Sequence, residues 1–311
     1  MSEQQTAAVM VATEESFDLA EGPVWDPIRQ RLLWVDIREG EVLVGRLHDD
    51  GTISLEERVA TPGMVGAVAV SEAGDWILAG ERRILTRSTS GEFAVGPAVL
   101  GFGAGERLND GKIDPAGRFV VGTLKIDESA TTQQRLVVVH RDGHLDDLDD
   151  DLTLANGLAW TADGTTLYSI DTGRHAVNVR DYDPATGTAG PRRVLIAIDG
   201  DVHPDGMCLD ADGYLWIAMW GGGQVRRYSP DGRLDRAIAV PAPHSSCVAF
   251  AGPDLAIMVI TTARKGLSDA QLAEFPFSGR LFTVDAGVRG PALPAWCGLP
   301  NLPPSTEERT P

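Results

Sequence analysis

The chain has 311 residues, 43% of them hydrophobic, which is enough to bury a sizeable core in one large domain or two modest ones. With 45 acidic residues against 27 basic ones, its formal net charge is −18. This balance argues against nucleic acid or an anionic membrane as a partner, because both require a basic face.

The sequence gives no sign of a membrane or secretory segment. The longest apolar runs, such as Asp254–Ile260, are far shorter than the ~20 residues that a membrane-spanning helix needs. The first residues lack a basic segment followed by a long apolar core, so we expect no secretory signal. Cys208, Cys247 and Cys297 are odd in number and follow no CxxC pattern. They are expected to be buried thiols of a cytoplasmic protein.

Short apolar segments, separated by 35 glycines and 19 prolines, predict many short strands. Six segments share one layout, in which an apolar strand is followed by a turn and a second apolar strand. In chain order they span residues 21–37, 65–81, 110–124, 156–172, 205–220 and 246–262. They recur every ~40 to 50 residues, which is the spacing of propeller blades.

A second, weaker motif falls between these segments, and each copy is typical of a hairpin that completes a four-stranded sheet. Its copies span residues 43–53, 136–145, 178–187, 225–234 and 281–290. Six four-stranded units predict an all-β fold, a six-bladed β-propeller with a central channel. A sandwich or two barrels would not explain an evenly spaced two-part repeat.

Three parts of the chain are expected. Residues 1–13 form an N-terminal segment whose apolar stretch TAAVMVAT is a candidate to join the last blade and close the ring. Residues 14–300 form the propeller, and the Pro-rich polar residues 301–311 form a C-terminal tail.

One position of the repeat carries polar residues that this fold would bring together. In the six units it is occupied by Glu21, Val65, Asp110, Asn156, Asp205 and Ser246. Because the first strand of each blade lines the channel, one repeat position corresponds to one height on the axis. Several carboxylates at that height would repel one another unless a cation were present.

Oxygen donors without a His or thiolate favour Ca²⁺, Mg²⁺ or Mn²⁺, and Zn²⁺ also binds carboxylates. In a single unit, an Asp-Gly or Asn-Gly pair would be an ordinary turn. The recurrence of oxygen donors in register across the repeat predicts instead a site for one divalent ion, with Ca²⁺ as the first choice.

Four motifs, in this order and spacing, resemble the family of gluconolactonase, regucalcin (senescence marker protein) and luciferin-regenerating enzyme. They are AEGPVW, RLNDGKIDPAGRFVVGT, NGLAWTADGTTLY and PDGMCLDADGYLWIA. The resemblance runs from about residue 17 to residue 296. It implies a six-bladed propeller with one divalent ion in the channel.

Carried over residue by residue, the resemblance implies that Glu21, Asn156 and Asp205 are the metal ligands. It also implies that Asp205 is the general base, and Asp110 is expected directly behind the ligands. A second set of residues is implied to contact the substrate: Arg107, Asn109 and, in a segment that aligns poorly with the family, Asp127.

Three protein ligands leave coordination positions open for water and substrate, as in catalytic ion sites. The hypothesis is metal-dependent hydrolysis of a small lactone of the aldonolactone type. The ion polarises the carbonyl, Asp205 takes a proton from the attacking water, and Arg107 and Asn109 orient the substrate. The alternatives are a calcium-binding regulatory protein of the regucalcin type, an esterase for a different ester, and an interaction scaffold. We expect a monomer or weak oligomer.

The six histidines add little to this hypothesis. His203 and His244 flank first strands and are expected near the channel mouth as rim or packing residues, and a contact of either with substrate stays open. The other four are expected in outer hairpins: His48, His140, His144 and His175.

Overall fold

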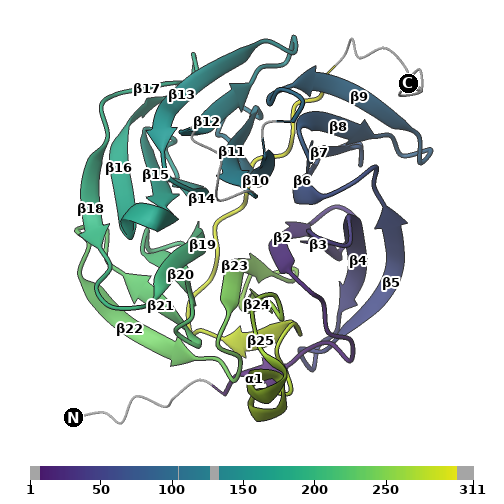
Figure 1. Ribbon diagram of the computed structural model, residues 1–311, viewed down its shortest axis with the longest axis vertical. Helices are drawn as coiled ribbons and strands as arrows, with labels where there is room; N and C mark the ends of the chain where they lie inside the picture. The colour runs from purple at the N-terminus through teal and green to yellow at the C-terminus, as the bar shows by residue number, and fades with distance from the viewer. Residues whose placement is uncertain (1–7, 104, 127–132, 300–311) are drawn as a thin grey trace.

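The computed structural model describes residues 8–103, 105–126 and 133–299. Six antiparallel sheets surround a central axis, and the first strand of each sheet lies nearest that axis (Figure 1). The fold is therefore the six-bladed β-propeller that the repeat predicted. Within the described ranges, no helix has the length and apolarity to cross a bilayer.

Blades one to three follow the chain in order from the axis outward. Blade one contains β2 (Ala20–Asp26), β3 (Arg31–Asp36), β4 (Glu41–Leu47) and β5 (Ile53–Ala60). Blade two contains β6 (Val65–Val70), β7 (Trp76–Gly80), β8 (Arg83–Arg87) and β9 (Phe93–Ala98). Blade three contains β10 (Glu106–Ile113), β11 (Phe119–Lys125), β12 (Gln134–Val139) and β13 (Leu145–Leu152).

Blades four to six continue the ring. Blade four contains β14 (Ala155–Trp160), β15 (Thr166–Asp171), the short helix η1 (Thr172–Arg174), β16 (Ala176–Asp183), β17 (Thr188–Ala189) and β18 (Arg193–Ala197). Blade five contains β19 (His203–Leu209), β20 (Leu215–Trp220), β21 (Gln224–Tyr228) and β22 (Leu234–Ala239). Blade six contains β23 (Ser245–Ala251), β24 (Ile257–Thr262) and β25 (Phe282–Asp285), with α1 (Asp269–Glu274) between the last two.

The first and the last strands of the described chain pair in blade six. Strand β1 (Met10–Val11) pairs antiparallel with β25, so Met10 lies opposite Thr283 and Val11 opposite Phe282. Ala12 O also accepts a hydrogen bond from Ile53 N of blade one at 2.7 Å. The N-terminal strand therefore completes the last blade and ties it to the first.

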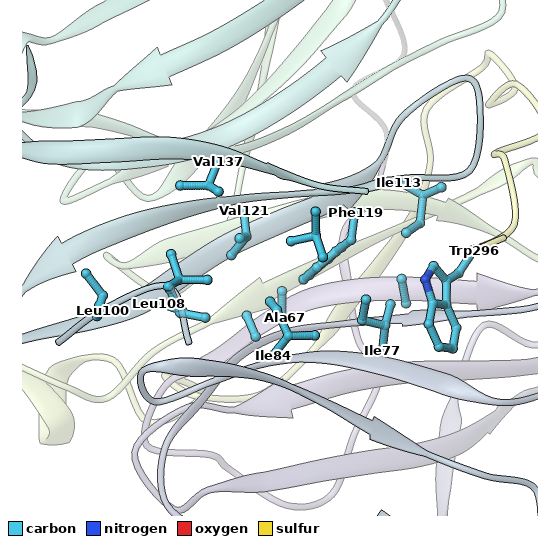
Figure 2. Packing of buried hydrophobic residues seen from close by; sticks show 14 residues of the cluster. Ala67, Ile77, Ile84, Leu100, Leu108, Ile113, Phe119, Val121, Val137 and Trp296 are labelled. Atoms are coloured by element: carbon cyan, nitrogen blue, oxygen red, sulfur yellow. The ribbon is translucent and has the colours of Figure 1, made fainter. Parts of the chain in front are cut away.

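The apolar core lies between successive blades. Inner and middle strands such as β3 are buried almost throughout, since blades pack against both of their faces, whereas the outer strand β5 alternates buried and exposed residues. Figure 2 shows one interface, where Ile77 and Ile84 of blade two face Phe119 and Val121 of blade three. Each blade thus buries its apolar faces only by stacking on its neighbours.

After β25 the chain crosses the propeller, and the last described residues lie between blades two and three. Trp296 packs into the core of that interface (Figure 2), and its backbone N–H donates to Val70 O at 3.0 Å. Cys297 N–H donates to Gly117 O of blade three at 2.9 Å. On the way, Pro291–Ala295 line one end of the channel. The expected tail 301–311 lies outside the described residues.

Close approach of neighbouring inner strands explains the repeated glycine. A Cβ at Gly66 would lie 2.7 Å from the Leu108 carbonyl oxygen of the next blade, and one at Gly157 would lie 2.7 Å from Asp205 O. At the same place in all six first strands, the pairing register with the second strand shifts. Such bulges re-aim side chains, and here they fall on the polar column of the repeat.

We expect Gly66→Ala to destabilise the protein by about 1–3 kcal/mol, because the added methyl group collides with rigid backbone of the next blade. Urea unfolding monitored by tryptophan fluorescence measures the change as a lower midpoint at constant slope. Gly101→Ala is the matched control, since Gly101 is exposed and its Cβ would meet nothing within 4 Å. Equal midpoints for the two variants would show that the inner strands are not held this closely.

Candidate metal and substrate site

The first residues of the inner strands line a cavity of about 350 Å³ at one mouth of the channel. Every candidate side chain that the structure describes, apart from Asp110, lines it: Glu21, Arg107, Asn109, Asn156 and Asp205. They come from β2, β10, β14 and β19. The repeat predicted the convergence of Glu21, Asn156 and Asp205, and the family resemblance added Arg107 and Asn109.

Asp110 does not line this cavity. Together with Lys112 it lines a second cavity, of about 440 Å³, formed by the later residues of the inner strands at the other mouth. The bulge between Leu108 and Gly111 in β10 separates the two orientations, because Asn109 lines one cavity and Asp110 the other. Asp110 still affects the first cavity through its charge.

Two buried carboxylates face the first cavity without a basic partner. Glu21 and Asp205 are only 8% and 7% exposed, yet neither forms an ion pair within 4.0 Å in the described part of the chain. Glu21 Oε2 accepts a hydrogen bond from its neighbour Gly22 N at 3.0 Å. Burial, followed by the charges of Asp205 and Asp110, raises the pKa of Glu21 well above its ordinary value. Burial and Asp110 do the same to the pKa of Asp205.

Other buried aspartates in the same fold are paired. Asp114 lies 2.6 Å from the Arg118 guanidinium, and Asp210 lies 2.7 Å from that of Arg227. Asp210 Oδ2 also accepts a hydrogen bond from Trp216 Nε1 at 2.9 Å. Glu21 and Asp205 have no such partner within the described residues, which leaves them available for a cation.

A chain of hydrogen bonds orients the amide of Asn156. Asn109 Nδ2 donates to Asn156 Oδ1 at 2.6 Å, and Arg107 Nη1 donates to Asn109 Oδ1 at 2.8 Å. Asn156 Nδ2 donates to Thr172 Oγ1 at 2.8 Å, and this hydroxyl donates to Pro204 O at 2.7 Å. The amide oxygen of Asn156 is therefore held toward β10, with one lone pair still free.

Thr172 was absent from the sequence prediction. It lies at the start of η1, just after the second strand of blade four, where its backbone N–H donates to Leu154 O at 3.0 Å. This position carries no recurring polar residue in the repeat, so no pattern marks it. It joins blade four to Pro204, the residue before Asp205.

Two cations line the same cavity. Arg107 is only 5% exposed, and burial lowers its pKa to about 10 against the opposing effects of Glu21 and Asp205. Lys265, which the sequence analysis also missed, lies in the loop between β24 and α1. Although Lys265 is exposed as a whole, burial of its ammonium and the charge of Arg107 lower its pKa, while Asp205 raises it.

Aromatic rings form the rim. His203 and Trp220 line the cavity, and His244 stacks on Trp220 with ring centroids 4.1 Å apart and an interplanar angle of 14°. The prediction that His175 lies in an outer hairpin is wrong. Its ring lies 4.5 Å from that of His203, because η1 brings the turn between β15 and β16 to this side of the blade.

The remaining residues that the sequence singled out do not line this cavity in the described part of the chain. Asp127 lies outside the described residues. Ser246 Oγ donates to Ala20 O of blade one at 2.6 Å and so connects the last blade to the first. All three cysteines are free, and Cys208 and Cys247 are buried as expected, whereas Cys297 is half-buried.

The donors fit a hard divalent cation. Glu21 and Asp205 offer two carboxylates and Asn156 one amide oxygen, which is the oxygen chemistry that Ca²⁺ and Mg²⁺ prefer. A cation among them would offset the burial and the repulsion that raise the pKa values of Glu21 and Asp205. In the described ranges, no three His, Cys, Asp or Glu side chains form a metal-binding group by themselves. The amide oxygen of Asn156, which lines the same cavity, is the candidate for a third protein ligand.

Comparison with known proteins places the chain in a family. The family model for the SMP-30/Gluconolactonase/LRE-like region matches residues 19–264. The chain therefore belongs to this family, as its four motifs predicted. Regucalcin from Sus scrofa is 31% identical over 284 residues, covering 89% of this chain and 94% of that protein.

Solved structures agree with this assignment. A regucalcin from Agrobacterium tumefaciens, described as a calcium-binding protein, is 30% identical with a TM-score of 0.86 and covers 93% of this chain and 97% of its own. A gluconolactonase from Xanthomonas campestris has a TM-score of 0.70 and covers 90% of this chain and 89% of its own. At 22% identity, the latter likeness concerns the fold alone.

We expect divalent ions to raise the melting temperature more at pH 8 than at pH 5.5. Because the pKa values of Glu21 and Asp205 are raised in the fold, the metal-free protein loses stability as these groups ionise with rising pH. A bound cation reverses this loss and competes with protons at low pH. Differential scanning calorimetry with and without Ca²⁺ measures the increment.

Asp205→Asn should abolish the increment while raising the melting temperature of the metal-free protein at pH 8. Asp142→Asn is the matched control, since Asp142-Gly143 is an exposed Asp-Gly turn in which Asp142 accepts from His144 N at 3.0 Å. An increment that is independent of pH, or that persists in Asp205→Asn, would contradict an ion bound by these carboxylates.

We expect Thr172→Val to weaken metal binding about tenfold or more, because the Asn156 amide loses the acceptor that orients it. Isothermal titration calorimetry of the metal-free protein with Ca²⁺ measures the change. Thr186→Val, at an exposed turn residue, should leave the affinity unaltered. Equal affinities for both variants would mean that this hydrogen bond does not position a ligand.

Proposed function

We propose that the protein is a divalent-metal-dependent hydrolase that opens the ring of a small lactone of the aldonolactone type. The observation that carries the proposal is the cavity with two buried, unpaired carboxylates and an oriented amide, in a chain of the SMP-30/gluconolactonase family. Glu21, Asn156 and Asp205 are the proposed ligands of one divalent ion. Ca²⁺ is the first choice, with Zn²⁺, Mn²⁺ and Mg²⁺ as alternatives.

The cavity volume suits a small substrate. About 350 Å³ is at the lower end of the range for small-molecule sites, which is roughly 300–1,000 Å³. Its wall combines hydrogen-bonding groups with aliphatic side chains such as Leu124 and Leu154. A hydroxylated ring with one polar and one apolar face matches this wall.

The ion, when bound, would polarise the lactone carbonyl and stabilise the negative charge that develops on its oxygen. Asp205 would take a proton from the attacking water as a new C–O bond forms at the carbonyl carbon. The ring C–O bond then breaks, and the departing ring oxygen receives that proton. The product is an open-chain hydroxy acid.

Arg107 and Asn109 would position the substrate. Arg107 Nη1 donates to Leu108 O and Asn109 Oδ1, which holds the guanidinium plane of this cavity-lining residue in place. Both amide hydrogens of Asn109 are used by Ala155 O and Asn156 Oδ1, so this residue would act mainly by fixing its neighbours. A substrate contact of Asp127 stays a prediction.

A calcium-binding regulatory role is the second candidate, because the Agrobacterium relative is described as a calcium-binding protein. It requires metal binding without turnover. An esterase acting on a different ester is a third possibility for the same centre. We also propose that the protein is cytoplasmic, which its three free thiols support. We propose in addition that it is a monomer or weak oligomer.

We expect acid release from glucono-, galactono- or arabinonolactone to vanish when metal is stripped and to return with Ca²⁺, Mn²⁺, Mg²⁺ or Zn²⁺. Asp205→Asn should lower kcat by at least about 10²- to 10⁴-fold, because a proposed metal ligand and the proton acceptor are lost together. Asp142→Asn should match the unmodified protein. Metal binding without turnover of any lactone would favour the regulatory role, and turnover indifferent to metal would refute the mechanism.

A further inference from the structure

The cations at the cavity remain unpaired although carboxylates are near. In the described residues, neither Arg107 nor Lys265 forms an ion pair within 4.0 Å, and the Lys265 ammonium has no hydrogen bond there. The carboxylate of Asp18, which acts on Lys265 through its charge, instead pairs with Arg38, with 2.9 Å between Asp18 Oδ2 and Arg38 Nη1. Asp18 is therefore already paired, and the Lys265 ammonium stays available to a group that enters the cavity.

The backbone holds Lys265 in place. Its N–H donates to Asp18 O at 2.9 Å, and its carbonyl oxygen accepts from His244 Nδ1 at 3.0 Å. His244 in turn stacks on Trp220, which lines the cavity. The loop is thus fixed to blade one and to blade five, so the ammonium is presented at the mouth by a rigid support.

The charges of the site favour an anion. The carboxylates of Glu21 and Asp205 and the cations of Arg107 and Lys265 cancel, so the proposed divalent ion leaves the cavity positive. Asp110 beneath it offsets only part of this charge. The net charge of −18 opposes anions at a distance, but salt screens it beyond about 8 Å, whereas the cavity charges act at contact.

A neutral lactone would cover part of the Lys265 side chain without offering its ammonium a partner, which costs free energy. A carboxylate on the substrate would pair with the ammonium while the lactone carbonyl lies at the metal. Building on the proposed function, we infer that the substrates are lactones bearing a carboxylate substituent, and that Lys265 determines this specificity.

The test compares D-galactono-1,4-lactone with D-galactaro-1,4-lactone, in which a carboxylate replaces the terminal hydroxymethyl group. The unmodified protein should show the higher kcat/KM for the carboxylate-bearing lactone. Lys265→Gln should lower the ratio of the two kcat/KM values about tenfold, and Lys265→Arg should restore most of it. Arg233→Gln, which removes an exposed surface cation in the turn between β21 and β22, should leave the ratio unaltered.

An unaltered ratio in Lys265→Gln, or a preference for the neutral lactone in the unmodified protein, would overturn the inference while leaving the lactonase intact. If neither lactone is hydrolysed, the proposed function fails. The role of Lys265 in binding carboxylates can then still be tested by titration with the two open-chain acids. Calorimetric titration of the metal-loaded protein should show tighter binding of galactarate than of galactonate, with the difference lost in Lys265→Gln. Equal binding of the two acids would refute the role of Lys265.

Discussion

The structure depends on how closely six inner strands approach one axis. Gly66 and Gly157 lie against the backbone of the next blade, and a side chain at either position would push the blades apart. Because the strands are this close, side chains at one repeat position converge on a single small cavity. A bulge in every inner strand then decides which way each of them points.

The convergence of buried carboxylates costs electrostatic free energy, and in the channel no ion pair within the described residues offsets this cost. Elsewhere, buried aspartates such as Asp114 and Asp210 are matched by arginines. In the channel, Glu21 and Asp205 stay unpaired while Arg107 and Lys265 lie in the same cavity. Three buried charges without ion pairs, with Lys265 at their edge, are poorly suited to stability, which supports a role in binding a cation and a substrate.

The candidate ligands lie where membership of the SMP-30/gluconolactonase family leads one to expect them. This agreement concerns the framework of the site and leaves the choice of substrate to other residues. The family and the fold define the common framework of inner strands. Substrate choice depends on what surrounds that framework, and here the surrounding groups are Lys265, the stacked pair of Trp220 and His244, and the aliphatic wall at Leu124. A propeller can carry many activities for this reason.

The sequence by itself determined the six blades and the convergence of Glu21, Asn156 and Asp205, because a regular repeat converts sequence spacing into angular position around one axis. Only the tertiary structure decided the orientation of Asp110, the contact of His175 with His203, and the places of Thr172 and Lys265. A bulge, a short helix and an irregular loop control these residues. The helix and the loop lie outside the repeat, and the geometry of all three features depends on packing between blades that no local pattern encodes.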